Sequence, residues 1–182
     1  MNNIKQKIKV IKKIYKFKTP YFKILGETVI NQANNHVFEY YTLIRKNAIF
    51  IIPFDGKNVY FIKQYRHPIK KIILELPAGG KNPKENSIEC AHREILEETG
   101  IKAKNIKRIG FFYMSPSYSS QRADVYLATN LTKGEKSPEL TELITDLECV
   151  PITRLKKLIK NNNILSGPTL SSLYIFLNNV KK

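Results

Sequence analysis

The segment from Gly79 to Ile101, GGKNPKENSIECAHREILEETGI, concentrates carboxylates in a chain that is otherwise strongly basic, with 15 Asp and Glu against 31 Lys and Arg. Five of the acidic residues fall inside it: Glu85, Glu89, Glu94, Glu97 and Glu98. Like charges this dense on one helix repel one another, so the arrangement calls for a compensating cation. Because carboxylate oxygens are hard ligands, the segment predicts a site for Mg²⁺ or Mn²⁺.

The same segment predicts a helix that begins after Asn86 and ends before Gly100. Asn86 is a suitable N-cap with Glu89 three residues later, as in a capping box, and glycine is favoured directly after a helix. Apolar residues recur at helical spacing in Ile88, Ala91 and Ile95. This stripe is expected to face a core.

Three glutamates of this helix share one patch of its surface. Glu94 lies three residues before Glu97 and four before Glu98, so the three side chains are neighbours. Arg93, four residues before Glu97, is placed to hold that carboxylate. The alternative for the same residues is an acidic helix face that only contacts solvent.

The spacing of Gly79, Glu85 and the run from Arg93 to Ile101 resembles the Nudix box. This resemblance implies a loop–helix–loop that binds divalent metal and hydrolyses a nucleoside diphosphate linked to another group. It also implies the metal ligands, which would be Glu94, Glu97, Glu98 and the main-chain carbonyl of Ala78. Glu97 would share a further ion or orient the water, and Arg93 would hold the carboxylates in the catalytic site. The structural positions in the box would be Gly79, Glu85 and Gly100. Of these, Glu85 would steady the loop.

Motifs outside the box resemble the ADP-ribose pyrophosphatase branch of the family: Gln64-Tyr65-Arg66, Glu75-Leu76-Pro77-Ala78-Gly79 and Ser115-Pro116. The resemblance implies Mg²⁺-dependent cleavage of ADP-ribose to AMP and ribose 5-phosphate, in a homodimer built by the N-terminal strands. Substrate-binding residues would be Arg45, Arg66, Gly80, Ser115 and Gln121. Arginine suits this role because its planar fork matches phosphate oxygens.

Two loops depart from that branch. Ser117 and Gln121 stand where relatives usually have glycine and an acid, and Gln121 can hydrogen-bond a ribose hydroxyl without supplying charge. The loop acid that would take the proton from water is expected to be Glu142, with Glu139 and Glu135 as alternatives.

Two other functions remain open. The neighbouring branch that hydrolyses GDP-mannose or other nucleoside diphosphosugars shares the N-terminal sheet and the Ser-Pro. A basic RNA- or protein-binding module with the Nudix fold and without catalysis is the second alternative. The mutually repelling Glu94, Glu97 and Glu98 argue against that module, since an inactive site has no need of them.

The remaining chain predicts an α/β fold. Phe22–Val29 and His36–Ile44 flank a turn-prone stretch and predict a small N-terminal antiparallel sheet. Further strands are expected at Ala48–Phe54, Val59–Gln64, Ile72–Leu76, Ile106–Tyr113, Ala123–Asn130 and Leu143–Val150, and helices at Ile152–Ile159 and Thr169–Val180. The first two of these strands are expected to form a hairpin. Together they predict a Nudix α/β/α sandwich with a mixed sheet. We expect residues 1–45 to form a dimerisation sheet and residues 46–182 the hydrolase domain.

Composition narrows the function classes. The longest apolar run, Ala48 to Phe54, is too short to cross a bilayer, so we expect no membrane partner. With two cysteines, Cys90 and Cys149, and no signal peptide, a reducing cytoplasm is the expected location. The net charge of +16 comes without an RNA-binding or helix-turn-helix signature, so we expect a small nucleoside diphosphate rather than nucleic acid as the partner.

Overall fold

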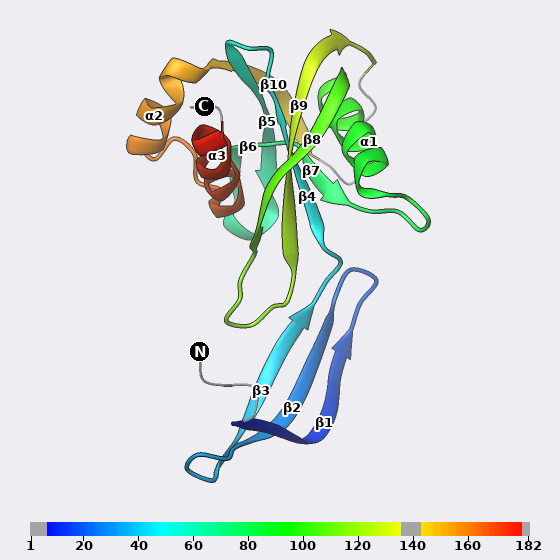
Figure 1. The fold of residues 1–182 in the computed structure, drawn as a ribbon, viewed down its shortest axis with the longest axis vertical. Helices are drawn as coiled ribbons and strands as arrows, with labels where there is room; N and C mark the ends of the chain where they lie inside the picture. The colour runs from blue at the N-terminus through cyan, green and yellow to red at the C-terminus, as the bar shows by residue number, and fades with distance from the viewer. Residues whose placement is uncertain (1–6, 136–142, 180–182) are drawn as a thin grey trace. The chain divides into compact units, whose positions relative to one another are not determined.

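The computed structural model describes residues 7–135 and 143–179, and these form two compact units. The smaller unit contains the described residues up to Lys46 together with Tyr113–Gln121. The larger unit contains Asn47–Phe112 and the described residues from Arg122 onward. Figure 1 shows the elements of both, coloured along the chain.

The smaller unit is built on a three-stranded antiparallel sheet. Its strands are β1 (Ile8–Lys18), β2 (Lys23–Asn31) and β3 (His36–Ile44), and β2 lies in the middle. The sequence predicts β2 and β3 but not β1. The reason is that the lysines of β1 interrupt the alternation of apolar and polar residues that indicates a strand. The backbone of β1 nevertheless pairs with β2 along most of its length.

The segment Tyr113–Gln121 is held against the end of β3 by hydrogen bonds. The backbone N–H of Leu43 donates to the Tyr118 carbonyl at 2.7 Å, and the Ser119 hydroxyl donates to the Leu43 carbonyl at 2.8 Å. The Tyr40 hydroxyl also donates to the Ser117 carbonyl at 2.6 Å. This segment therefore belongs structurally to the small sheet although it follows it by some seventy residues in sequence.

The larger unit contains two sheets. The first has the strand order β7-β4-β9-β8, with β4 (Ala48–Pro53) parallel to β9 (Arg122–Lys133) and antiparallel to β7 (Ala78–Gly80). Its edge strand β8 spans Ile101–Tyr113. The second has the order β10-β5-β6 and is antiparallel, with β5 (Asn58–Arg66) between β6 and β10. These two partners are β6 (Lys71–Glu75) and β10 (Ile144–Pro151), and the short 3₁₀ helix His67–Ile69 joins β5 to β6.

The hairpin expected between the strands at 48–54 and 59–64 is wrong. Only one bridge, Phe54 to Val59, joins them, and β4 and β5 belong to different sheets. The physical reason is burial: β4 is apolar throughout and buried on both faces, so it takes a central position with a parallel neighbour.

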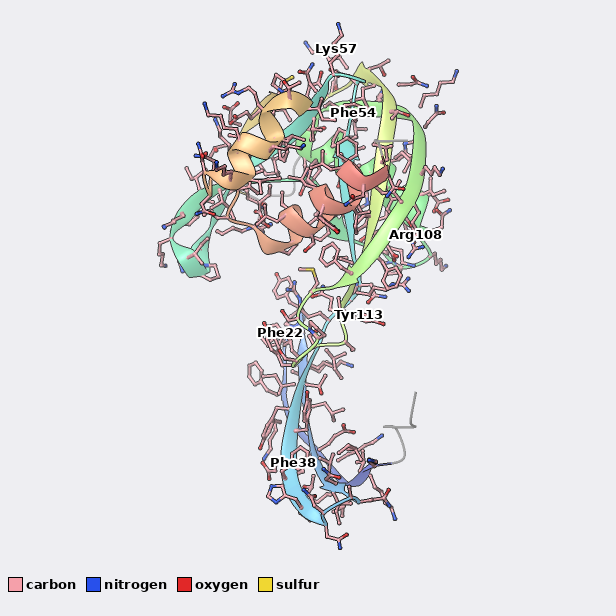
Figure 2. All side chains as sticks on the ribbon, turned by 60° about the vertical axis from the view of Figure 1, so that its left-hand side comes forward. Phe22, Phe38, Phe54, Lys57, Arg108 and Tyr113 are labelled. Carbon is pink, nitrogen blue, oxygen red and sulfur yellow. The ribbon has the colours of Figure 1, made fainter. Side chains whose placement is uncertain are left out.

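Helices cover both faces of the mixed sheet. On one face α1 (Ser87–Thr99) packs Ala91 and Ile95 against Ile49 and Ile51 of β4. On the other face lies α3 (Gly167–Asn179) (Figure 1). Its Phe176 ring meets that of Phe54, which Figure 2 labels, edge-on with centroids 5.2 Å apart. The helix α2 (Ile152–Lys160) follows β10 directly. The predicted α/β/α sandwich with a small N-terminal antiparallel sheet is therefore confirmed.

Candidate active site

Hydrogen bonds at its two ends determine where the acidic helix α1 begins and ends. The Asn86 side chain accepts hydrogen bonds from the backbone N–H groups of Ile88 and Glu89, and the Glu89 carboxylate accepts from the Asn86 N–H at 2.9 Å. At the other end Gly100 has φ 70°, and its N–H donates to the Leu96 carbonyl at 2.8 Å. Both predicted caps are confirmed. Glycine is favoured at the second one because it adopts this left-handed conformation without strain.

Arg93 lies at the centre of the carboxylates. Its Nε donates to Glu85 at 2.8 Å, Nη1 lies 2.8 Å from Glu97, and Nη2 lies 2.8 Å from Glu94. Nη2 also donates to the Gly80 carbonyl at 3.1 Å. Hydrogen bonds from Arg93 lower the pKa of Glu85 to about 2, and those to Glu85 raise the pKa of Arg93. A cation of the protein itself therefore offsets part of the repulsion on this helix.

Glu94 and Glu98 face the short strand β7. Both are buried, and the Glu98 carboxylate accepts a hydrogen bond from the backbone N–H of Ala78 at 3.0 Å. The Glu94 carboxylate fills the space that a β-carbon on Gly79 would need. Beneath it Cys90 is buried, and burial raises the pKa of this thiol to about 12. Residues of α1 and of β7 that are distant in sequence thus form one oxygen-rich surface.

The donor chemistry of this surface suits a hard divalent cation. Glu94, Glu98 and the main chain at Ala78 offer oxygen atoms, and Glu97 is partly exposed beside them. Within residues 7–135 and 143–179, no three His, Cys, Asp or Glu side chains stand in the geometry of a finished metal cage.

The expected substrate-binding residues are divided between the two units. Arg45, Ser115 and Gln121 belong to the smaller unit, and Arg66 and Gly80 belong to the larger one. In the smaller unit Arg45 is exposed, the Ser115 hydroxyl donates to the Met114 carbonyl, and Nε2 of the buried Gln121 donates to the Lys46 carbonyl at 2.7 Å.

In the larger unit Arg66 has a partner that the sequence did not assign. Its Nε donates to the Glu75 carboxylate at 2.6 Å, and the Glu75 side chain is only 9% exposed. The signal for Glu75 was an acid inside the otherwise apolar run 72–76, which predicts a buried and paired carboxylate.

The remaining predicted site residues are the loop glutamates, one of which is expected to take the proton from water. Glu142 and its alternative Glu139 lie outside the described residues. Glu135 is described and is exposed, just after the end of β9.

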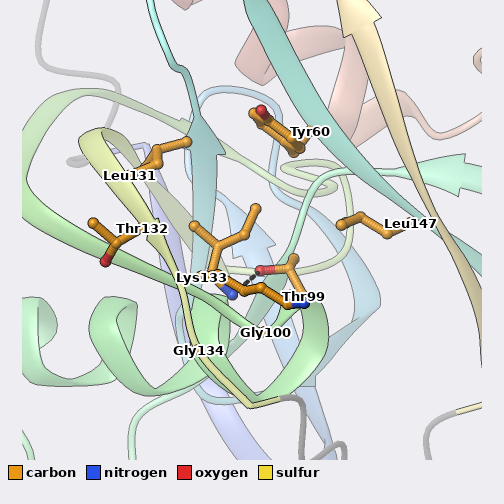
Figure 3. Close-up of a pocket in the computed structure, with 9 residues that line it drawn as sticks. Tyr60, Thr99, Gly100, Leu131, Thr132, Lys133, Gly134 and Leu147 are labelled. Atoms are coloured by element: carbon orange, nitrogen blue, oxygen red, sulfur yellow. Dashed lines mark hydrogen bonds between the residues drawn. The ribbon is translucent and has the colours of Figure 1, made fainter.

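A separate cavity of about 550 Å³ opens beside the C-terminal end of α1 (Figure 3). Its lining is largely apolar and includes Tyr60, Leu131, Lys133 and Leu147. Of the predicted site residues it contains Gly100, at the opposite end of the helix from the Asn86 cap.

Comparison with known proteins identifies the family of this chain. Residues 44–170 match the model of the NUDIX domain, so the chain belongs to the Nudix family. Within that family it is similar to the ADP-ribose pyrophosphatase of Bacillus subtilis (strain 168), with 32% identity over 123 residues, 67% of this chain and 66% of that protein. It is also similar to the methanol dehydrogenase activator of Bacillus methanolicus, with 30% identity over 125 residues and 68% of each chain.

A crystal structure of an ADP compounds hydrolase has the same fold. The TM-score is 0.87 at 20% sequence identity, and the match covers 97% of this chain and 95% of that one. In the described part of this chain, none of the helices has the length and apolar character needed to cross a membrane.

Proposed function

We propose that the protein hydrolyses the diphosphate bond of ADP-ribose with Mg²⁺, releasing AMP and ribose 5-phosphate. One observation carries this proposal: Glu94 and Glu98 of α1 meet Ala78 and Gly79 of β7, with Arg93 bonded among the carboxylates. Similarity to an ADP-ribose pyrophosphatase supports the choice of substrate.

The metal would be held by Glu94, Glu98, the main-chain carbonyl of Ala78 and, for a further ion, Glu97. Mg²⁺ is our first choice and Mn²⁺ is a possible substitute, because both prefer oxygen ligands. When bound, the ion would supply charge neutralisation at the diphosphate and activate water for attack on phosphorus.

The protein's own groups would position this chemistry. Arg93 holds Glu85 and Glu97 through hydrogen bonds of 2.8 Å, which fixes their carboxylates before substrate arrives. Glu85 in turn accepts from the Asn82 N–H at 2.8 Å and so ties the loop to the helix. Glu142 would accept the proton from the attacking water, a step that typically contributes about 10²–10⁴-fold.

Substrate contacts would come from arginine and from polar loop groups. Arg66 and Arg45 would bind the diphosphate or the adenine side, since guanidinium groups pair with phosphate oxygens. Gly80 would allow close approach of the substrate, because no atom of the described residues beyond its chain neighbours lies within 4 Å of an added β-carbon there. Ser115 and Gln121 would contact the terminal ribose.

A panel of substrates tests the proposal. We expect kcat/KM with Mg²⁺ to be at least about tenfold higher for ADP-ribose than for GDP-mannose, which corresponds to roughly 1.4 kcal/mol in transition-state binding. Equal rates would favour the broader nucleoside diphosphosugar hydrolase. No turnover of any member, with diadenosine polyphosphates and NADH included, would favour a binding module without catalysis.

We also propose a homodimer that forms through the N-terminal sheet. Apolar side chains are exposed on β1 and β3 and in the turn after β1: Val10, Ile11, Phe17, Tyr21, Val37 and Tyr41. A sheet of only three strands is at the lower limit for independent stability, so a second copy of the sheet is the expected cover of these apolar side chains. Light scattering should give about twice the chain mass of 21.1 kDa, and a monomer at micromolar concentration would exclude the dimer.

We propose a cytoplasmic location because neither cysteine forms a disulfide. Cys90 and Cys149 are both unpaired, as expected in a reducing compartment.

A further inference from the structure

Two arginines of the larger unit share one buried carboxylate. Asp124 of β9 accepts from Nε of Arg108 at 2.8 Å on Oδ1 and from Nη2 of Arg122 at 3.0 Å on Oδ2. The Asp124 side chain is 10% exposed, whereas those of Arg108 and Arg122 are 45% and 41% exposed. We call Arg108, Phe111, Arg122 and Asp124 the arginine cluster. It contains none of the residues expected from the family resemblance.

Both arginines of the cluster lie over the aromatic ring of Phe111. The guanidinium carbons of Arg108 and Arg122 each lie 5.4 Å from the centroid of this ring. Contact with an aromatic face uses the flat side of a guanidinium and leaves its N–H edge available. The cluster therefore presents oriented donors rather than two mobile side chains.

The cluster has more positive charge and more donors than its own acid satisfies. Two guanidinium groups against one carboxylate leave one net positive charge. In addition Nε of Arg122 is buried and has no hydrogen-bond partner among the residues that the structure describes. Buried donors in proteins are nearly always paired, so Asp124 alone does not satisfy the donors of this cluster.

The cluster lies on the same sheet face as the carboxylates of α1. Gly79 and Asp124 are both directly opposite Ile49, on the two sides of β4. Residues directly opposite one another point to the same face of a sheet. The β-carbon direction of Gly79 meets Glu94, and Ile49 packs with Ala91 of α1, so Asp124 also points to the α1 face. Two strand spacings separate Gly79 from Asp124, or about 10 Å between Cα atoms.

We propose that the arginine cluster is a second anion subsite, which binds a phosphate group that the substrate carries outside its diphosphate bridge. This inference rests on the proposed function. The separation of about 10 Å would place the cluster beyond the diphosphate, beside the ribose of the nucleoside. A phosphate there would meet the free edges of Arg108 and Arg122 in the bidentate geometry that guanidinium groups favour. The preferred substrates would then be nucleoside diphosphosugars with an additional phosphate.

The test compares ADP-ribose with ADP-ribose 2′-phosphate. Equilibrium binding is measured by calorimetry in EDTA, where no turnover occurs, and kcat/KM is measured with Mg²⁺. We expect the additional phosphate to improve both by about tenfold, as charge-assisted hydrogen bonds allow. Most of this preference should be lost in Arg122→Gln and, separately, in Arg108→Gln. Thermal unfolding of both variants should stay cooperative. Arg154→Gln, an equal charge change at an exposed position of α2, should keep it.

Other outcomes separate the subsite from the proposed function. Equal binding of the two ligands by the unaltered protein, or a preference that survives both substitutions, would overturn the subsite even if ADP-ribose is hydrolysed. A preference in binding without turnover would overturn the hydrolase and leave the subsite standing. Binding of inorganic phosphate alone, lost in Arg122→Gln but without any preference between the two ligands, would show a site for free phosphate and overturn the substrate role.

Discussion

The carboxylate of Glu94 occupies the position that a β-carbon on Gly79 would take. The backbone of Gly79 is not in the left-handed region, so glycine is not required here by its φ angle. It is required because the acidic helix and the strand β7 approach one another so closely. This single contact connects the glycine that begins the acidic segment with a predicted metal ligand fifteen residues later.

Replacing this glycine should therefore remove activity without unfolding the protein. In Gly79→Ala the added methyl group must displace the Glu94 carboxylate, and we expect kcat/KM to fall by about 100-fold or more, as for lost support of a metal site. The control is Gly167→Ala at the start of α3, where an added β-carbon meets no described residue outside its own chain neighbourhood within 4 Å. Normal rates for Gly79→Ala with ADP-ribose would contradict the placement of the metal at Glu94.

Glu98→Gln separates the charge of this residue from its shape. The amide oxygen can still accept from the Ala78 N–H, but the negative charge is lost, so turnover should fall by at least about 100-fold. Without metal the melting temperature should stay the same or rise, since repulsion from Glu94 and Glu97 is relieved. Glu89→Gln, which keeps the capping box of the same helix, should leave turnover unchanged. Mn²⁺ binding measured by electron paramagnetic resonance should weaken only in Glu98→Gln.

The ion pair between Glu85 and Arg93 should give the stability a pH dependence. The pKa of Glu85 is about 2 in the folded protein against an ordinary 4.5, because Arg93 donates hydrogen bonds to the charged form. A lowered folded pKa stabilises above the unfolded value, so this contribution is complete above about pH 5 and is lost as the pH falls toward 2. Urea unfolding at pH 7 should show Glu85→Gln less stable by about 1–3 kcal/mol. The difference should narrow between pH 5 and 3, and a constant gap would show that Glu85 acts by shape alone.

Gln121 holds its own unit together through the Lys46 carbonyl. In Gln121→Glu the donor at 2.7 Å is lost and a carboxylate oxygen faces the carbonyl, so the free energy of unfolding should decrease by about 1–3 kcal/mol. Gln32→Glu, the same change at an exposed position after β2, should have little effect. Unchanged stability of Gln121→Glu in urea would show that this hydrogen bond does not anchor the segment, and sharper selectivity for ADP-ribose would support the proposed contact with the ribose.

Much of the site was predictable because it is local. The helix α1 begins at Asn86 and ends at Gly100 because side-chain and backbone bonds within four residues specify both ends. The i, i+4 pair of Arg93 and Glu97 was predicted for the same reason, and its distance of 2.8 Å confirms it. Apolar periodicity also located β2, β3 and most strands of the larger unit, although β8 begins five residues earlier than predicted and β7 was not predicted.

The partners of each strand and the contacts between elements were decided only by the tertiary structure. The sequence placed β4 beside β5, but burial of both faces of β4 favoured β7 and β9, which come from other parts of the chain. The same holds for Arg66 with Glu75 and for Asp124 with its two arginines, since each pairing depends on the register of neighbouring strands. Spacing along the chain specifies helices and their caps because those hydrogen bonds are short in sequence. Strand order depends on which arrangement buries the most apolar surface over the whole chain, and no local pattern contains that information.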